Sequence, residues 1–362
     1  MMSSPTTTNP NMKEPLCMNW PMIIYISLVH IIGCYGIYNA IANPHHLYTY
    51  LWTLSLWIIS GLGITAGAHR LWSHRSYKAR YALRVVLMLF NSIANQGSVI
   101  HWVRDHRVHH LYSDTDKDPH DSQRGFFYSH VGWLLVRKPK VVLDAGRKIS
   151  FQDLYKDNIL LLQHRLCPWW NMVWCFIFPA IVGYYLWNES MINGILLPGV
   201  FRYCFVLHAT WCVNSVVHRW GPKPYDITSK TTECGMVAFL ALGEGWHNWH
   251  HTFDWDYVTA EMDAIKQYNP TKIFIDIMYY LGLAYDLRRA NPKGWEHFKA
   301  RNLRKLGDEY YVIETIEGRA PFCYRSTTYK RRHVSTDNND DGKAITRRLS
   351  SLVDNMSTDE GE

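Results

Sequence analysis

The sequence predicts an all-α polytopic membrane protein, with four transmembrane helices and a cytosolic helical cap that holds a nine-histidine di-metal site. Three observations predict this fold class. Apolar residues gather in blocks long enough to cross a bilayer. Only 19% of the 362 residues are charged, whereas 48% are hydrophobic and 14% aromatic, which disfavours disordered, collagen-like and coiled-coil chains. The 19 histidines cluster instead of being scattered.

Four blocks of about 20 residues are expected to cross the membrane, at about 22–41, 47–68, 168–187 and 194–214. The alternative is a set of buried helices in a soluble protein, but such helices rarely lack charges for so long. Arg202 is the one charge deep in a span. Before the first span, the sequence lacks the basic region, short apolar core and cleavage site of a signal peptide. We therefore expect the first span to stay in the mature protein.

The distribution of Lys and Arg predicts the orientation. Both are absent from residues 42–46 and 188–193 but frequent in residues 69–167 and near the C-terminus. By the positive-inside rule, both termini and the long central loop then lie in the cytosol. The partly apolar stretch 83–100 contains Arg84 and several amides, so we interpret it as interfacial or re-entrant.

The domain organisation follows from these spans. We expect a cytosolic N-terminal segment at 1–20, a membrane domain at 21–310, and a disordered cytosolic tail at 324–362, where the residues are polar and of mixed charge. The eight cysteines form no C-x-x-C pair, and several lie in apolar blocks. They indicate buried thiols and not a disulfide framework.

Three histidine clusters suggest metal chemistry: H-R-L-W-S-H at 69–74, H-R-V-H-H at 106–110 and H-N-W-H-H at 247–251. Positions i, i+3 and i+4 share a helix face, so each of the last two clusters is expected to present three imidazoles together. His69 and His74 are five residues apart, about 140° around an ideal helix. They need a helix end or a distortion to serve one site.

In the four-span topology, nine histidines lie on one side of the membrane and can converge: His69, His74, His106, His109, His110, His218, His247, His250 and His251. One H-x-x-H-H alone could be structural, but this combination disfavours that interpretation. Nine imidazoles exceed the ligands of one zinc ion, so two metals are implied. No H-E-x-x-H supplies the glutamate of a zinc protease, and imidazole-rich coordination suits iron that handles O₂.

The sequence around these clusters closely resembles the membrane acyl-CoA desaturases of the stearoyl-CoA desaturase family, from about residue 22 to 307. Within this family, the sequence is most similar to insect members. The matching stretches are GITAGAHRLWSHRSYKA (63–79), WVRDHRVHH (102–110), DPH (118–120), RGFFYSHVGWLLVRK (124–138), NSVVHRWG (214–221), PYD (224–226) and GEGWHNWHH (243–251).

This resemblance implies an enzyme of the endoplasmic reticulum membrane. A centre of two Fe²⁺ ions would use O₂ to introduce a double bond, most simply cis at Δ9, into a saturated fatty acyl-CoA. Electrons would come from a separate cytochrome b5 and its NADH-dependent reductase, and no nucleic acid is involved. The family's histidine ligands fall on the nine histidines above, its water-mediated ligand falls on Asn214, and no further catalytic group is implied.

The resemblance also assigns substrate contacts. Residues that bend the acyl chain correspond to Gln96, Trp102 and Thr210, a thioester neighbour to Trp211, and coenzyme A contacts to Arg104, Asp105, Arg137 and Lys138. The alternatives are interior packing for Gln96 and the tryptophans, and a solvated basic pair at Arg137 and Lys138. For Arg104 and Asp105 the alternative is a role in orienting imidazoles.

Some positions depart from the family pattern. Pro21 and Met22 replace an Arg-Asn pair, Gly97 replaces an Asn, and His208 replaces another Asn, so polar substrate contacts are missing. The tunnel end corresponds to Trp57 and Gly61. We expect the indole to lean over the space that Gly61 leaves and to form a floor for chains of about 14 to 18 carbons.

Other functions remain as alternatives at this stage. A hydroxylase, a conjugase or a desaturase of another position would use similar histidine clusters. A metal-dependent membrane hydrolase would not require O₂ and a reductant. An inactive lipid-binding module is disfavoured because all nine histidines are present.

Overall fold

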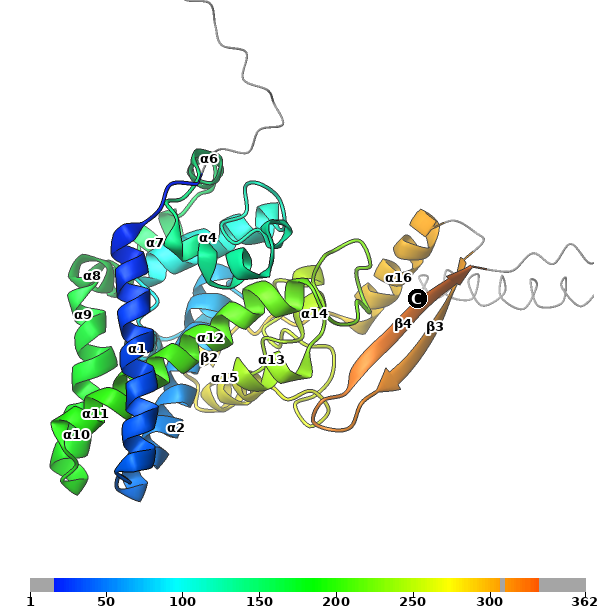
Figure 1. The fold of residues 1–362 in the computed structure, drawn as a ribbon. Helices are drawn as coiled ribbons and strands as arrows, with labels where there is room; N and C mark the ends of the chain where they lie inside the picture. Colours follow the sequence, from blue (N-terminus) through cyan, green and yellow to red (C-terminus); the bar gives the residue numbers. More distant parts are fainter. Residues whose placement is uncertain (1–15, 307–309, 332–362) are drawn as a thin grey trace, which may run out of the picture.

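The computed structural model describes residues 16–306 and 310–331, and this part of the chain is mainly helical (Figure 1). Four helices are long and apolar enough to cross a membrane: Trp20–Ala42, Leu47–Ser73, Trp169–Trp187 and Met191–His218. They coincide with the four predicted spans, and several continue for a few residues beyond them. The protein is therefore a multi-pass membrane protein, as predicted.

Only the first span, α1 (Trp20–Ala42), is one regular helix. The other three combine α-helical segments with wider π-helical turns, or end in a tighter 3₁₀ turn. Their segments are α2 (Leu47–Leu62) and η1 (Gly63–Ser73); α9 (Trp169–Met172), η4 (Val173–Ile177) and α10 (Phe178–Trp187); and α11 (Met191–Gly194), η5 (Ile195–Phe201), α12 (Arg202–Ser215) and η6 (Val216–His218). Pro198 lies inside η5 and cannot donate a backbone hydrogen bond, which accounts for an irregular turn there.

Arg202, the one charge within a span, is fully buried and bonded to carbonyl oxygens. Its guanidinium donates to Pro198 O at 3.0 Å, Ile93 O at 2.9 Å and Cys175 O at 2.8 Å. Cys175 O lies four residues before Pro179, which has no N–H to offer it, and Ile93 O lies in the last turn of its helix. Arg202 therefore satisfies carbonyls that regular helices leave open.

The stretch predicted to be interfacial or re-entrant forms a bent helix pair. Helices α3 (Tyr81–Ala94) and α4 (Val99–Tyr112) meet at 84°. Asn95 and Gly97 have positive φ angles of 49° and 83° at the bend, which amide and glycine residues tolerate best. The bend brings α4 against η1, so the first two histidine clusters meet on the same side of the membrane.

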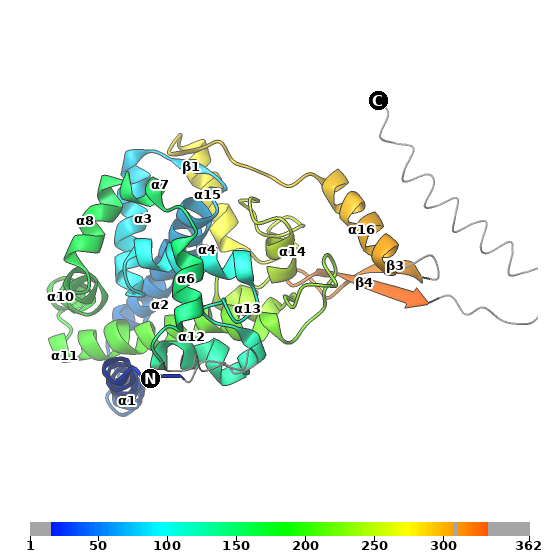
Figure 2. The ribbon, with the colours of Figure 1, turned by 90° about the horizontal axis from the view of Figure 1, so that it is seen from above.

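A helical cap covers one end of the spans (Figures 1 and 2). Its first part lies between the second and third spans and contains η2 (Ser122–Arg124), η3 (Tyr128–Gly132), α5 (Trp133–Leu135), α6 (Lys140–Arg147), α7 (Gln152–Tyr155) and α8 (Asn158–Leu166). Its second part follows the fourth span and contains α13 (Gly235–Leu240), α14 (His247–Thr252), α15 (Pro270–Tyr280) and α16 (Pro292–Leu306). Strand β1 (Lys78–Ala79) pairs antiparallel with β2 (Ala284–Tyr285) and connects the two parts.

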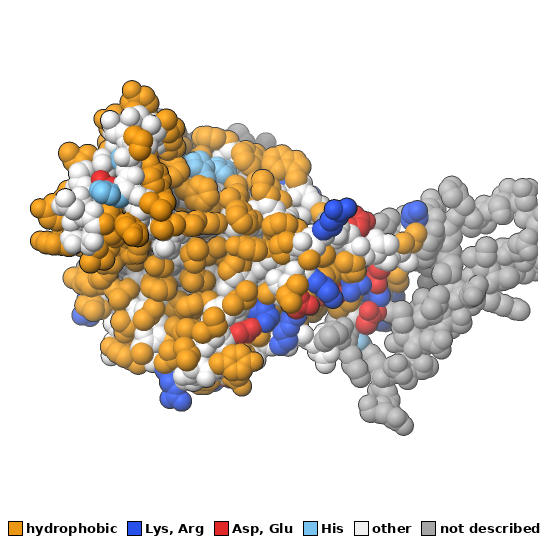
Figure 3. All heavy atoms as spheres, turned by 90° about the horizontal axis from the view of Figure 1, so that it is seen from below, with side chains coloured by type: hydrophobic (Ala, Val, Ile, Leu, Met, Phe, Trp, Pro, Cys, Tyr) orange, Lys and Arg blue, Asp and Glu red, His pale blue; other side chains and the backbone are white. Residues whose placement is uncertain are grey.

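The surface seen from below is dominated by hydrophobic side chains, as a membrane protein requires, and charged side chains gather towards the edge beside the C-terminal region (Figure 3). In the interior, an apolar core joins η1, α3, α4, α8 and α15 around Leu87, Val103 and Leu160. The eight cysteines are free, but the prediction that they are buried holds only for Cys175 and Cys204, whereas Cys17 and Cys34 are exposed.

The sequence prediction starts the disordered tail at residue 324, which is too early in the chain. Residues 324–331 form strand β4 (Tyr324–Arg331), which pairs antiparallel with β3 (Tyr310–Glu317). Gly318, with a φ of +83°, starts the connection, and β-branched residues such as Thr327 and Thr328 favour the extended strand over disorder. The rest of the predicted tail, 332–362, lies outside the described residues, as does most of the N-terminal segment.

Candidate metal centre

Five histidine side chains form the first of two pockets. His69 and His74 come from η1 and its end, His106 and His110 from α4, and His250 from α14. Their Nε2 atoms face one another, at 2.9 Å for His69 and His250, 2.8 Å for His74 and His106, and 3.0 Å for His110 and His250. We call this group the five-histidine pocket.

The four-histidine pocket consists of His109, His218, His247 and His251. The Nε2 atom of His247 lies 3.1 Å from that of His218 and 3.0 Å from that of His251. In each pocket, the ligand atoms lie within 4.8 Å of one another, so each group could hold one metal ion. All nine predicted histidines are thus brought together, in groups of five and four.

The two H-x-x-H-H clusters are divided between the pockets. On α4, His106 and His110 serve the five-histidine pocket while His109 serves the other; on α14, His247 and His251 serve the four-histidine pocket while His250 serves the other. Each cluster thus presents its three imidazoles to the centre, as expected, but divides them between the two pockets. Residues i and i+4 share a face, but i+3 diverges enough to reach a second ion.

The distortion expected between His69 and His74 is present. The segment η1 is π-helical, and His74 N donates to His69 O, an i to i+5 bond. The wider turn brings residues five apart towards one face, and the two ring centroids lie 4.8 Å apart.

Carboxylates lie behind four of the histidines, and the sequence reasoning missed them. His109 Nδ1 lies 2.9 Å from Asp118 Oδ2, His218 Nδ1 lies 3.0 Å from Asp114 Oδ2, and His69 Nδ1 lies 2.9 Å from Glu244 Oε2. His74 Nδ1 is 3.8 Å from Asp254 Oδ2. Acidic residues close to the histidine clusters were the available signal. A carboxylate that accepts from Nδ1 fixes the tautomer in which Nε2 offers its lone pair.

The charges around the pockets favour ionised carboxylates and neutral imidazoles, except at His109, whose pKa is raised by Asp118 against the effect of burial. Burial would raise the pKa of Glu244, but Arg70 and His69 outweigh it and lower the pKa to about 2. Burial likewise opposes ionisation of Asp114, yet His218 lowers its pKa to about 2. Burial and neighbouring histidines lower the pKa of five imidazoles well below 6.5, namely His106, His110, His247, His250 and His251. Neutral imidazole is the form that binds metal, so the donor set fits two metal ions.

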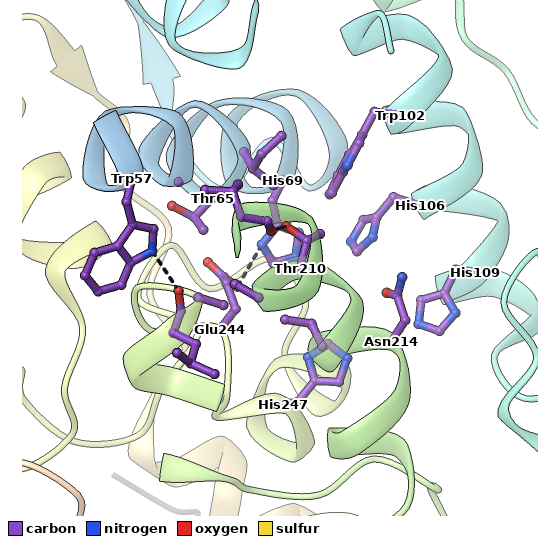
Figure 4. A pocket seen from close by; sticks show the side chains of 17 residues that line it. Trp57, Thr65, His69, Trp102, His106, His109, Thr210, Asn214, Glu244 and His247 are labelled. Atoms are coloured by element: carbon purple, nitrogen blue, oxygen red, sulfur yellow. Dashed lines mark hydrogen bonds and ion pairs between the residues drawn. The ribbon is translucent and has the colours of Figure 1, made fainter. Parts of the chain in front are cut away.

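An apolar cavity ends at these pockets (Figure 4). Its walls include Ile64, Val206, Ala209, Val213 and Leu240, and its polar end is lined by His69, His106, His109, His247 and Asn214. The predicted chain-bending residues form one network beside it. Trp102 Nε1 donates to Gln96 Oε1 at 3.1 Å, and Gln96 Nε2 donates to Thr210 Oγ1 at 2.9 Å.

At the other end of the cavity, Trp57 Nε1 donates to Leu240 O at 3.1 Å, and the indole packs against Phe205 and Phe239. Gly61 also lines the cavity, but the space beside it is taken by Leu242, whose Cδ1 lies 2.6 Å from where a Cβ at 61 would be. The indole was expected to fill that space. Leu242 fills it instead, because α2 and the segment after α13 approach closely there.

Other predicted contacts lie elsewhere. Lys138 and Asp105 form an ion pair, and Arg104 lies against Gly146 of α6. Trp211 is buried and is absent from the cavity lining; it packs against His30, His130 and His208 instead.

Those three histidines form a chain of contacts that was not predicted from the sequence. His208 Nε2 lies 3.0 Å from His30 Nε2, and His208 Nδ1 lies 3.0 Å from His130 Nε2. The three residues are distant in sequence, and only the packing of α1, η3 and α12 brings them together.

Comparison with known proteins agrees with this geometry. Residues 23–257, more than half of the chain, match the family model described as fatty acid desaturase. The chain is 46% identical to an acyl-CoA desaturase of Cyprinus carpio over 279 residues, which cover 77% of this chain and 84% of that relative. It is 46% identical to an acyl-CoA Delta-9 desaturase of Acheta domesticus over 269 residues, which cover 74% of each chain. It is 44% identical to a stearoyl-CoA desaturase of Bos taurus over 299 residues, covering 83% of this chain and 81% of the relative.

Proposed function

The chain belongs to the fatty acid desaturase family of oxidoreductases, and from this premise we propose that it is an O₂-dependent di-iron desaturase of saturated fatty acyl-CoA. The single observation that carries the proposal is the placement of two histidine pockets at the polar end of an apolar cavity. Such a cavity suits an alkyl chain, and the pockets lie where one segment of that chain would pass.

The reaction is balanced as a four-electron reduction of O₂. Two hydrogen atoms, which are two protons and two electrons, leave two adjacent CH₂ groups, and a C=C bond forms between these carbons. Two more electrons come from a one-electron donor, two protons come from solvent, and O₂ becomes two waters. Iron held by the nine histidines would supply the oxidising chemistry, and a cytochrome b5 with its reductase would supply electrons. A Δ9 position for the double bond is supported by the name of the relative from Acheta domesticus, an acyl-CoA Delta-9 desaturase.

The residues of this chain determine where the oxidation occurs. The hydrogen-bonded network of Gln96, Trp102 and Thr210 holds the cavity wall beside the pockets, and we assign it the role of bending the acyl chain. Asn214 lines the cavity near His109 and His247, and we assign it a water-mediated contact to the metal (Figure 4). Trp57 closes the far end and limits chain length.

We place the coenzyme A headgroup on the cap surface around Arg104, Asp105, Arg137 and Lys138. Arginine and lysine bind phosphates, and Asp105 holds the Lys138 ammonium in position. Trp211, buried beneath His208, supports the nearby wall of α12 and does not touch the acyl chain in this assignment. The protein would lie in the endoplasmic reticulum membrane, with both termini and the cap in the cytosol.

The test is expression in yeast that lacks its own acyl-CoA desaturase, followed by mass spectrometry that locates double bonds in the lipids. We expect monounsaturated chains that require O₂, and none from the His106→Ala variant. Hydroxylated or conjugated products would assign the chain to a related oxidation. Absence of any oxidised lipid from a correctly inserted protein would contradict the proposal.

A further inference from the structure

The two pockets differ in the charges behind their imidazoles. In the five-histidine pocket, Glu244 contacts His69 through Oε2, but its Oε1 accepts from Arg70, at 2.8 Å from one terminal nitrogen and 3.1 Å from Nε. Arg70 is fully buried, so its positive charge is not screened by solvent. The other carboxylate, Asp254, is 3.8 Å from His74 and 49% exposed. This pocket therefore has one close carboxylate, whose charge a guanidinium balances.

The four-histidine pocket has two close carboxylates, Asp118 and Asp114, with side chains 0% and 7% exposed. Among the described residues, neither forms an ion pair with Lys or Arg within 4.0 Å. Their remaining hydrogen bonds come from neutral donors. Asp118 accepts from the backbone N–H groups of Asp114 and His120, and Asp114 accepts from the hydroxyls of Ser122 and Ser113.

Lysine side chains nearby do not reverse this difference. Lys223 interacts electrostatically with Asp114, and Lys138 with His120, but neither is in ion-pair contact with Asp114 or Asp118 in the described part of the chain. The remaining neighbour of Asp118 is His120, whose Nδ1 lies 3.3 Å from Asp118 Oδ1.

Charge behind a ligand changes how well the ligand supports an oxidised metal. A carboxylate bonded to Nδ1 makes the imidazole a stronger electron donor, and buried negative charge stabilises added positive charge. In the five-histidine pocket, Arg70 balances the charge of Glu244, so this pocket gives an oxidised ion less of that support.

We propose that Asp114 and Asp118 make the four-histidine pocket the electron-rich half of the centre, so that a redox metal bound there is oxidised before one bound in the five-histidine pocket. The inference rests on the proposed two-iron function. Asp114 and Asp118 are positioning residues in this proposal, because they act through His218 and His109. The two halves of the centre are then inequivalent from the start of the reaction.

The experiment uses the full chain in lipid nanodiscs, loaded anaerobically with ⁵⁷Fe²⁺ and titrated with ferricyanide, which removes one electron per iron. Mössbauer spectra count ferrous and ferric iron at each step. For the wild type we expect two ferrous signals, one of which is lost before the other. If both irons are oxidised in parallel, the proposal is wrong. If the chain binds no iron, the proposed function fails before the titration begins.

Matched substitutions identify the pocket. Asp118→Asn should make the first oxidation at least tenfold less favourable, which corresponds to about 59 mV for one electron, and should bring the two steps together. Glu244→Gln removes a carboxylate from the other pocket, so it should separate the steps further. Asp144→Asn, at a carboxylate of α6 that pairs with Arg147 and lies outside both pockets, should change neither.

A second variant protects the test against misfolding. If Asp118→Asn does not retain two irons, Asp114→Asn gives the same measurement through His218. Unchanged oxidation order and spacing in the aspartate variant that retains iron would contradict the proposal. A Glu244→Gln variant in which the two oxidation steps come closer together would also contradict the proposal.

Discussion

The two ends of the cavity are built by different forces. At the polar end, imidazoles from η1, α4, η6 and α14 converge, and several of them donate a hydrogen bond from Nδ1 to a carboxylate that holds them in place. At the closed end, one hydrogen bond from Trp57 and the packing of Phe205 and Phe239 form the floor. Hydrogen bonds restrict both distance and direction, whereas apolar packing tolerates exchanges that conserve volume. We infer that the chemistry is fixed at one end and the substrate length is adjustable at the other.

The largest effect is expected at the polar end. His106→Ala and His218→Ala, one from each pocket, should abolish the desaturated product because each removes a proposed metal ligand. Mass spectrometry of lipids from membranes that contain equal amounts of protein measures the effect. His46→Ala, on an exposed histidine outside the pockets, is the control and should retain activity. Full activity of either pocket variant would remove that residue from the ligand set.

A smaller effect is expected where the two ends meet. Thr210→Val keeps the side-chain shape but removes the acceptor of the Gln96 amide, which leaves a half-buried donor without this partner at a cost of about 1 kcal/mol. We expect additional products with the double bond at neighbouring positions. Thr53→Val is the matched control, since its hydroxyl bonds only to Thr49 O of its own helix in the described structure. If the Thr210→Val products carried a double bond at one unchanged position, the network would not control where the double bond forms.

The headgroup contacts should affect binding more than chemistry. Reversing the charges of Arg137 and Lys138 together should raise KM for acyl-CoA several-fold with little change in kcat, because a remote anchor contributes mainly uniform binding. The reversal also places a like charge beside Asp105. Initial rates at low salt measure this effect, and reversal of Lys148, an exposed residue of the same cap, is the control. An unchanged KM would make the pair part of the solvated surface.

The closed end should respond by changing selectivity and not activity. Trp57→Ala opens the floor, so the products should shift towards longer chains, at about 1 kcal/mol or roughly fivefold per methylene. The double bond should keep its distance from the thioester, because the residues at the other end are intact. Trp57→Phe retains most of the aromatic volume and should shift the profile less. If the distance of the double bond from the thioester changed with chain length, the two ends of the cavity would not act independently.

The smallest effect is expected at Gly61. A methyl group there meets the end of the Leu242 side chain at 2.6 Å, so Gly61→Ala should destabilise the protein by about 1 kcal/mol while Leu242 changes its rotamer. Thermal unfolding in detergent measures this change. Combining Gly61→Ala with Leu242→Ala should remove the strain. A large change in chain length without loss of stability would indicate that the methyl group meets substrate instead.

Local patterns allowed the sequence to predict much of this architecture. The spans follow from apolar block length, and the nine histidines follow from helical spacing and the side of the membrane on which they lie. The division of His106 and His109 between the pockets was not predicted, because it depends on where η1, η6 and α14 place the other histidines around α4. Asp114 and Glu244 were missed for a related reason: their partners His218 and His69 are more than 100 residues away. The contact between Leu242 and Gly61 likewise depends on tertiary packing and could not be predicted from local patterns.

The buried Arg202 has a consequence for how the protein is made. An arginine at the centre of an isolated apolar helix adds about 2.5–3.5 kcal/mol to the cost of membrane insertion. Its acceptors at Ile93 and Cys175 belong to segments that the ribosome completes earlier. We therefore expect α12 to enter the bilayer efficiently only after α3 and η4 are in place, so that translation order and tertiary packing jointly determine the insertion of the last span. A chain truncated to present the fourth span without its predecessors should leave that helix outside the membrane more often than the full chain does.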